Sequence, residues 1–177
     1  MLDNLKKIIA NQFNAAMGTL HRCIVECPES MWHANVAINP FSQSAFHALF
    51  FADLYLGLNI HEQPEQAFHK QHQIVFNGYE QMQQAKPVKT YDREFILEYL
   101  QFCRDKADRV LESETSQDLM DASGFPWIES TRSEVHLYNI RHIQHHAAQL
   151  ILRLRLDSDV DVPWFRSGWS LPTENAS

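Results

Sequence analysis

The segment EVHLYNIRHIQHHAAQLILRLR, residues 134–155, combines a long helical pattern of apolar side chains with a dense group of histidines. His142 and His146 are four residues apart, so a helix stacks their imidazoles on one face, as two ligands of one metal ion require. The helical period places the following residues on that face: Val135, Asn139, His142, His146, Gln149, Leu150 and Arg153. Imidazoles and amides stand where an ordinary surface helix carries Lys and Glu, which indicates a lined cavity. Paired histidines are more often solvated or hydrogen-bonded than metallated, so this segment alone leaves both explanations open.

Composition limits the fold and the partners. The 177 residues suffice for one domain with a full core, and 45% apolar and 21% charged residues are ordinary for a globular protein. With only 5 glycines and no regular strand-and-turn spacing, the chain is predicted to be all-α. A net charge of −7 without a basic patch argues against nucleic acid and anionic membranes as partners. We expect one domain over residues 1–157 and a C-terminal tail over 158–177 that packs on this domain or frays from it.

The first residues and the cysteines favour a cytoplasmic protein. The start, MLDNLKKIIANQF, lacks the uninterrupted apolar core of a signal peptide, and no run reaches membrane-spanning length. Cys23 and Cys27 lie at i,i+4 spacing within a helical pattern, which favours small core residues over a redox pair. The odd number of cysteines offers no disulfide framework and agrees with a reducing compartment.

Four stretches with helical spacing predict four long helices. They span about residues 3–27, 40–60, 92–114 and 134–155. The predicted N-terminal caps are Asp3, Asn39 before Pro40, Thr90 or Asp92, and a capping box of Thr131 and Glu134. The first helix has apolar residues at Leu5, Ile8, Ile9, Phe13, Met17, Leu20 and Ile24. Pro28 ends this helix, and residues 29–39 are expected to form a loop.

The second predicted helix, PFSQSAFHALFFADLYLGLNI, is apolar almost all round, as expected of a helix covered on several sides. His47 lies in its middle, on a face shared with Gln43 and Phe51. It is either a buried histidine with a hydrogen-bond partner or a metal ligand, and on this helix alone the first reading is favoured.

Two irregular segments complete the chain. Residues 62–89 show no sustained apolar period and predict a long, partly helical excursion. Histidines and aromatic residues in or next to it are either ordinary solvated side chains or cover a pocket mouth: His61, His69, His72, Phe76 and Tyr79. The tail after Asp157 carries Trp164 and Trp169, and we hypothesise that it borders the same pocket.

Four helices with short or medium connections predict a four-helix bundle, in which sites form from inward side chains of facing helices. His47 would then meet His142 and His146 in the interior. Three neutral imidazoles suit Zn, Ni, Fe or Co, and they leave positions open for water or substrate, as in catalytic sites. The zincin peptidase motif is excluded, because Ile143 stands where that motif has its glutamate base.

At these residues the chain resembles the DinB-like or YfiT-like superfamily of metalloenzymes, over roughly residues 3–155. That family has four helices, a ligand histidine on the second helix, and a fourth-helix signature H-x-x-H-H-x-G-Q-L, which reads HIQHHAAQL here. The resemblance implies metal ligands at His47, His142 and His146, with His145 as a non-ligand. Ala148 departs from the family's usual glycine without touching a ligand.

The resemblance implies a divalent metal cofactor and three kinds of activity: metal-dependent hydrolysis, transfer of low-molecular-weight thiols to electrophiles, and thiol-dependent isomerisation of small acids. It also implies a small-molecule substrate and a homodimer, which the apolar surplus of residues 40–60 also favours. The sequence identifies no general base; Asn139 and Gln149 either orient ligands or water or are structural helix-packing amides. The alternative is a non-catalytic helical binding or stress-response protein with a structural or vestigial metal site.

Overall fold

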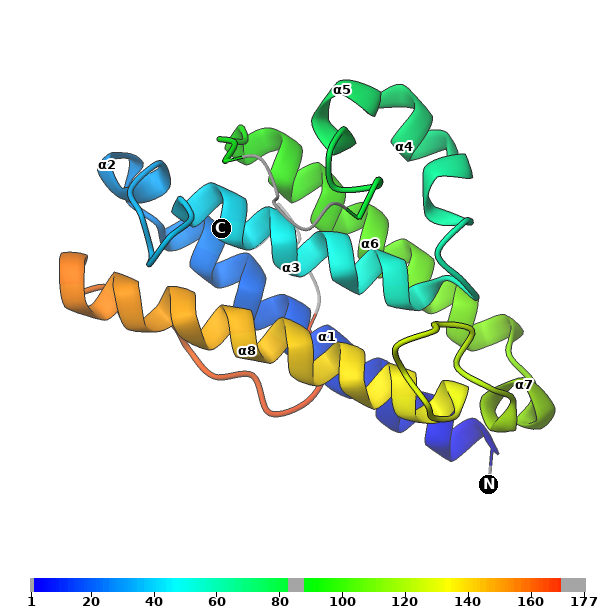
Figure 1. Cartoon of the computed structure of the whole chain (residues 1–177). Helices are drawn as coiled ribbons and strands as arrows, with labels where there is room; N and C mark the ends of the chain where they lie inside the picture. The colour runs from blue at the N-terminus through cyan, green and yellow to red at the C-terminus, as the bar shows by residue number, and fades with distance from the viewer. Residues whose placement is uncertain (1, 83–87, 170–177) are drawn as a thin grey trace.

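Four long helices pack side by side and enclose the main core (Figure 1): α1 (Leu2–Glu26), α3 (Phe41–Leu56), α6 (Arg93–Ser113) and α8 (Arg132–Ser158). The computed structural model describes residues 2–82 and 88–169, and this part of the chain is all-helical. Both α1 and α3 contact α6 and α8, so α1–α6 and α3–α8 form opposite sides of the arrangement. None of the helices in the described ranges has the length and apolar content that crossing a bilayer requires.

The four predicted helices are present with shifted ends. Because α1 already begins at Leu2, Asp3 lies in its first turn and is not its N-cap. Pro40, not Asn39, occupies the N-cap of α3, which ends at Leu56, four residues before the predicted end. At α8 the predicted capping box is present, with the backbone N–H of Thr131 donating to Glu134 Oε2 at 3.4 Å.

Two short helices lie where the sequence predicted none. The first, α2 (Glu29–Trp32), interrupts the expected loop, because buried Trp32 donates from Nε1 to the carbonyl of Tyr91 at 2.7 Å and fixes this turn. The second, α7 (Ser116–Met120), begins at a capping box of Thr115 and Asp118.

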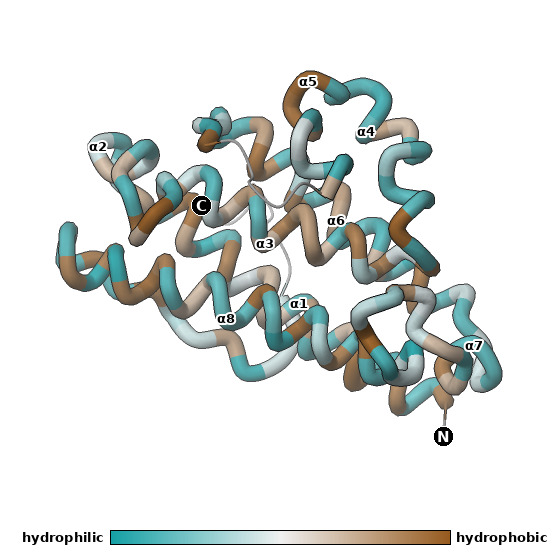
Figure 2. The backbone as a smooth tube through the Cα atoms, in the orientation of Figure 1, coloured by the Kyte–Doolittle hydropathy of each residue, from teal (hydrophilic) through white to brown (hydrophobic). Residues whose placement is uncertain are grey.

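The excursion between α3 and α6 is partly helical, as predicted, with η1 (Gln63–Glu65), α4 (Ala67–Gln71) and α5 (Gln73–Phe76). Phe76 and Tyr79 are fully buried against α3, where their rings contact Phe46 and Phe50. The excursion therefore covers a side of α3 that α6 and α8 leave open. This cover accounts for the apolar residues that α3 carries all round. Along α8, in contrast, brown and teal residues alternate, as expected of a helix with one buried face (Figure 2).

The tail leaves the end of α8 and runs back across the bundle (Figure 1). Trp169 packs on His21 of α1, with ring centroids 4.7 Å apart, and the guanidinium of Arg104 of α6 lies 4.5 Å from its ring centroid. Trp164 is exposed. The prediction that the tail borders the pocket is therefore wrong for residues 158–169, because this part docks on the α1–α6 side. Residues 170–177 lie outside the described ranges.

Candidate metal centre

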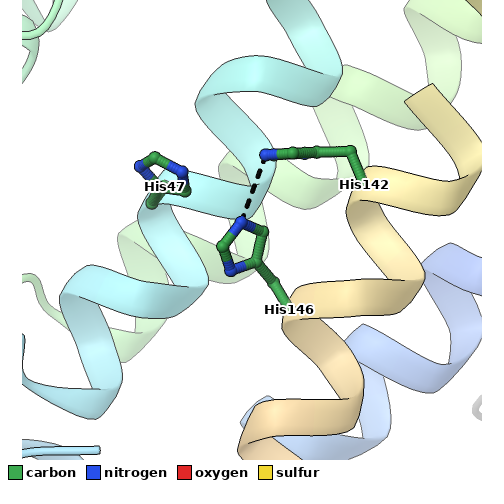
Figure 3. A group of neighbouring side chains, drawn as sticks. All are labelled: His47, His142 and His146. Carbon is green, nitrogen blue, oxygen red and sulfur yellow. Dashed lines mark hydrogen bonds between the residues drawn. The ribbon is translucent and has the colours of Figure 1, made fainter. Parts of the chain in front are cut away.

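Three histidines from two helices converge between α3 and α8 (Figure 3). His47, His142 and His146 each offer one ring nitrogen, and these nitrogens all lie within 4.8 Å of one another. The Nε2 atoms of His142 and His146 are 3.2 Å apart. The ring centroid of His47 lies 4.7 Å from that of His146 and 5.6 Å from that of His142. The residues predicted to meet do meet, and His145 is not part of the group.

Packing of α8 against α3 fixes this geometry. Ile143 and Ala147, each directly after a ligand histidine, are fully buried, and Asn139 Nδ2 donates to the carbonyl of Ala52 at 2.9 Å. Asn139 is thus a helix-packing amide, one of the two roles that the sequence left open for it. The rings of Phe51 and Tyr55 flank His142, with centroids 5.5 and 6.2 Å away. The imidazoles therefore project from rigid helices into partly apolar surroundings.

The electrostatics keep the pair on α8 neutral. Burial, together with the neighbouring imidazoles of His146 and His47, lowers the pKa of His142 to about 3. Burial also lowers the pKa of His146, partly opposed by a hydrogen bond to Gln149. Neutral imidazoles keep a lone pair for a metal ion, and proton competition is weak at neutral pH.

The donor set fits a divalent ion. In a tetrahedral zinc site with Zn–N bonds of about 2.0–2.1 Å, ligand nitrogens lie about 3.3 Å apart. The separation between His142 Nε2 and His146 Nε2, 3.2 Å, already matches this value. Gln149 Oε1 accepts from Nδ1 of His146 at 3.2 Å, which leaves Nε2 as the free ligand atom. The 3.2 Å contact between the Nε2 atoms of His142 and His146 also suits an N–H···N hydrogen bond between the rings. A metal titration distinguishes this hydrogen bond from a metal site.

A hollow of about 340 Å³ opens beside His47 and His146. Its other lining residues come from the loop before α3 and from both helices: Val36, Ala37, Ile38, Asn39, Ser44, Gln149, Leu152 and Arg153. The loop residues were not predicted to take part. The sequence signal was an apolar run, Val36–Ile38, directly before the helix that carries His47. The hollow leaves one side of the triad accessible to a small molecule.

The five residues named for the excursion and its border have different surroundings, and His61 is exposed, as the solvated alternative predicted. His69 is buried rather than solvated, and it lies between the carboxylates of Asp53 and Glu80. None of the five residues proposed as a pocket cover lines the hollow. Tyr79 comes nearest, since its ring centroid lies 6.4 Å from that of His47. The excursion therefore packs against α3 without lining the hollow.

No family model, curated protein or solved structure matches the chain. The resemblance to the DinB-like superfamily consequently rests on the motif and the helices, and its functional consequences are proposals.

Proposed function

We propose that this chain is a metal-dependent enzyme of the DinB-like type that acts on a small molecule, as a hydrolase or as a thiol transferase. The observation that carries the proposal is the approach of His47, His142 and His146 to within 4.8 Å. The four packed long helices and the signature HIQHHAAQL support the assignment to this superfamily. Zn, Ni, Fe and Co all suit three imidazoles.

The hollow favours a catalytic over a structural role for the metal. A structural zinc site is closed by four protein ligands, whereas a catalytic site keeps a position for water or substrate. Three histidines beside a hollow of about 340 Å³ fit the second description. The chemistry that a divalent ion supplies when held by three imidazoles is Lewis acidity, which lowers the pKa of a water or a thiol.

The chain's own residues position and shield this chemistry. Gln149 holds His146 in the tautomer that presents Nε2, and the rings of Phe51 and Tyr55 shield His142 on the inner side. Exposed apolar side chains at Ile38 and Leu152 offer a contact surface for the carbon skeleton of a substrate.

Metal analysis of protein purified without a histidine tag tests the proposal directly. We expect about one divalent ion per chain, removable by a chelator. The loaded protein is then assayed with activated esters, and separately with low-molecular-weight thiols plus an electrophilic acceptor. Protein that takes up no metal from any of the four candidate ions would refute the proposal.

The homodimer remains a prediction from the resemblance alone. The apolar surplus of α3, which also suggested it, is covered within one chain by α6, α8 and the excursion. Light scattering at tens of micromolar measures the oligomeric state, and a monomer under those conditions would count against it.

A further inference from the structure

Arg153 is the one lining residue of the hollow, among the described residues, that carries a permanent charge. Apart from Arg153 and the two histidines, the lining is apolar or consists of neutral amide and hydroxyl groups. The whole chain has a formal net charge of −7, so an approaching anion is repelled unless a local cation attracts it. Arg153 supplies that cation next to the triad.

The guanidinium of Arg153 is only partly engaged. Its Nη2 pairs with Asp157, one turn further along α8. Its Nε is buried and has no hydrogen-bond partner among the described residues. A buried N–H donor without a partner is costly, and an acceptor bound in the hollow would relieve that cost after a small rotation of the side chain.

The position of Arg153 on α8 relates it to the metal ligands. It follows His146 by seven residues, which is two helical turns or about 10 Å along the axis, on the same face. The ion pair with Asp157 holds the guanidinium toward the C-terminal end of α8, so a ligand that joins it to His146 must span about 10 Å or more. Ile38 and Leu152, 84% and 56% exposed, line the same hollow and offer apolar contacts.

We propose that Arg153 is an anion subsite, and that the hollow takes a small organic carboxylate whose carboxyl group binds this guanidinium. The apolar part of the ligand packs on Ile38 and Leu152, and its other end reaches the triad. A carboxylate is favoured over a phosphate, because one guanidinium shared with Asp157 suits a single negative charge. Only the role of the other end rests on the proposed function; the subsite itself does not require a metal.

The first experiment uses metal-free protein, so that no ion can bind the carboxylate. Calorimetry compares octanoate with octanamide, which has the same chain but no charge. The wild type is expected to bind octanoate about tenfold more tightly, and Arg153→Gln is expected to remove this preference. Arg155→Gln is the matched control, because Arg155 pairs with Asp161 and does not line the hollow. Arg153→Lys keeps the positive charge but loses the paired N–H donors of the guanidinium, so it should keep part of the preference for octanoate.

The second experiment uses zinc-loaded protein and two hydroxamates of equal chain length, octanohydroxamic acid and suberic acid monohydroxamate. The hydroxamate group binds zinc, and only the second probe ends in a carboxylate. The second probe should bind more tightly to the wild type and to Arg155→Gln, but not to Arg153→Gln.

The two arms separate the two proposals. If both hydroxamates bind through zinc but the carboxylate adds nothing, the subsite is wrong and the metal site stands. If zinc does not bind but the octanoate preference follows Arg153, the metal proposal fails and the subsite stands. An octanoate preference that survives Arg153→Gln, or that Arg155→Gln removes equally, overturns the subsite.

Discussion

Inside the core, Nε2 of His69 lies 2.6 Å from Oδ2 of Asp53. The same oxygen accepts hydrogen bonds from Tyr99 Oη at 2.9 Å and Gln63 Nε2 at 3.0 Å, and Lys106 Nζ pairs with the other oxygen. Asp53 has no exposed surface. One carboxylate on α3 thus joins the excursion, which carries Gln63 and His69, to α6, which carries Tyr99 and Lys106.

Replacing Asp53 by Asn should destabilise the fold in a pH-dependent way. At pH 7 the substitution leaves Lys106 buried without its charge partner, at a cost of about 3 kcal/mol. Burial alone would raise the pKa of Asp53, but the hydrogen bond from His69 and the charge of Lys106 bring the pKa below its usual value. A lowered pKa gives stability that is present above about pH 4 and is lost as the pH falls through the folded pKa.

Urea unfolding at pH 7, 5 and 3 measures this effect. The difference in free energy of unfolding between wild type and Asp53→Asn should be large at pH 7 and smaller at pH 3. Asp105→Asn, an exposed position on α6, is the matched control and should stay within about 0.5 kcal/mol of wild type. An equal difference at pH 7 and pH 3 would show that the carboxylate charge is not the stabilising feature.

Arg132 closes the C-terminal end of α3. Its guanidinium donates to the carbonyls of Tyr55, Leu56 and Gly57 at 2.7–2.8 Å, and its Nε donates to Glu114 at 2.7 Å. Arg132→Met leaves these buried acceptors unpaired, so we expect a loss of about 3 kcal/mol or more in urea unfolding.

Arg155→Met is the control for this substitution, because Arg155 is exposed and, within the described part of the chain, pairs only with Asp161. It should change the free energy of unfolding by less than about 0.5 kcal/mol. If the two variants were equally stable, the capping role of Arg132 would be refuted.

The absence of a side chain at Gly18 allows Trp169 of the tail to pack closely on α1. A Cβ at this position would lie 2.5 Å from Cγ of Trp169, which is closer than real Cβ contacts. Gly18→Ala should therefore displace Trp169 and make the tail more sensitive to protease, as mass spectrometry of the fragments would show. Zinc affinity should not change, because Trp169 packs on the α1–α6 side. A loss of zinc binding in this variant would mean that the tail and the site are coupled.

Gln149 should tune the metal site through His146. Gln149→Leu removes the acceptor for Nδ1 of His146, so zinc affinity should fall about tenfold, measured by competition with a coloured chelator. Gln144→Leu, on the same helix, is the control, since Gln144 makes no hydrogen bond to a ligand histidine among the described residues. Equal affinities in both variants would leave Gln149 without a role in positioning His146.

Apolar patterns predicted the four long helices, because α1, α6 and α8 bury apolar residues at helical spacing and α3 is a long apolar run. The early end of α3 had a local signal in Gly57, its C-cap, whereas the binding of the last carbonyls by Arg132, some 75 residues later in the chain, was not predictable. The buried network had a visible signal in Asp53, a lone acidic residue in an apolar helix, but its partners come from separate elements. Leu5 and Ile8 follow the helical spacing yet are exposed, whereas Ile9 is buried, so part of the apolar stripe at this end of α1 faces outward.

The approach of His47 to His142 and His146 was predictable, because facing helices of a bundle direct their inner residues toward one another. The hollow beside them was not, since the loop residues Val36–Ile38 reach it only through the fold of the α2–α3 connection. Spacing alone also could not show that His69 is buried, because its partner Asp53 lies 16 residues away on another helix.

The central claim is that His47, His142 and His146 bind one divalent ion, and a zinc titration of the wild type and of single His→Ala variants tests it most directly. The wild type should bind one zinc, and its melting temperature should fall when a chelator removes the metal. His47→Ala, His142→Ala and His146→Ala should each lose zinc affinity steeply and respond little to the chelator. His145→Ala, adjacent in sequence but outside the group, should bind zinc like the wild type. Full zinc binding by His47→Ala, together with its loss in His145→Ala, would contradict the account.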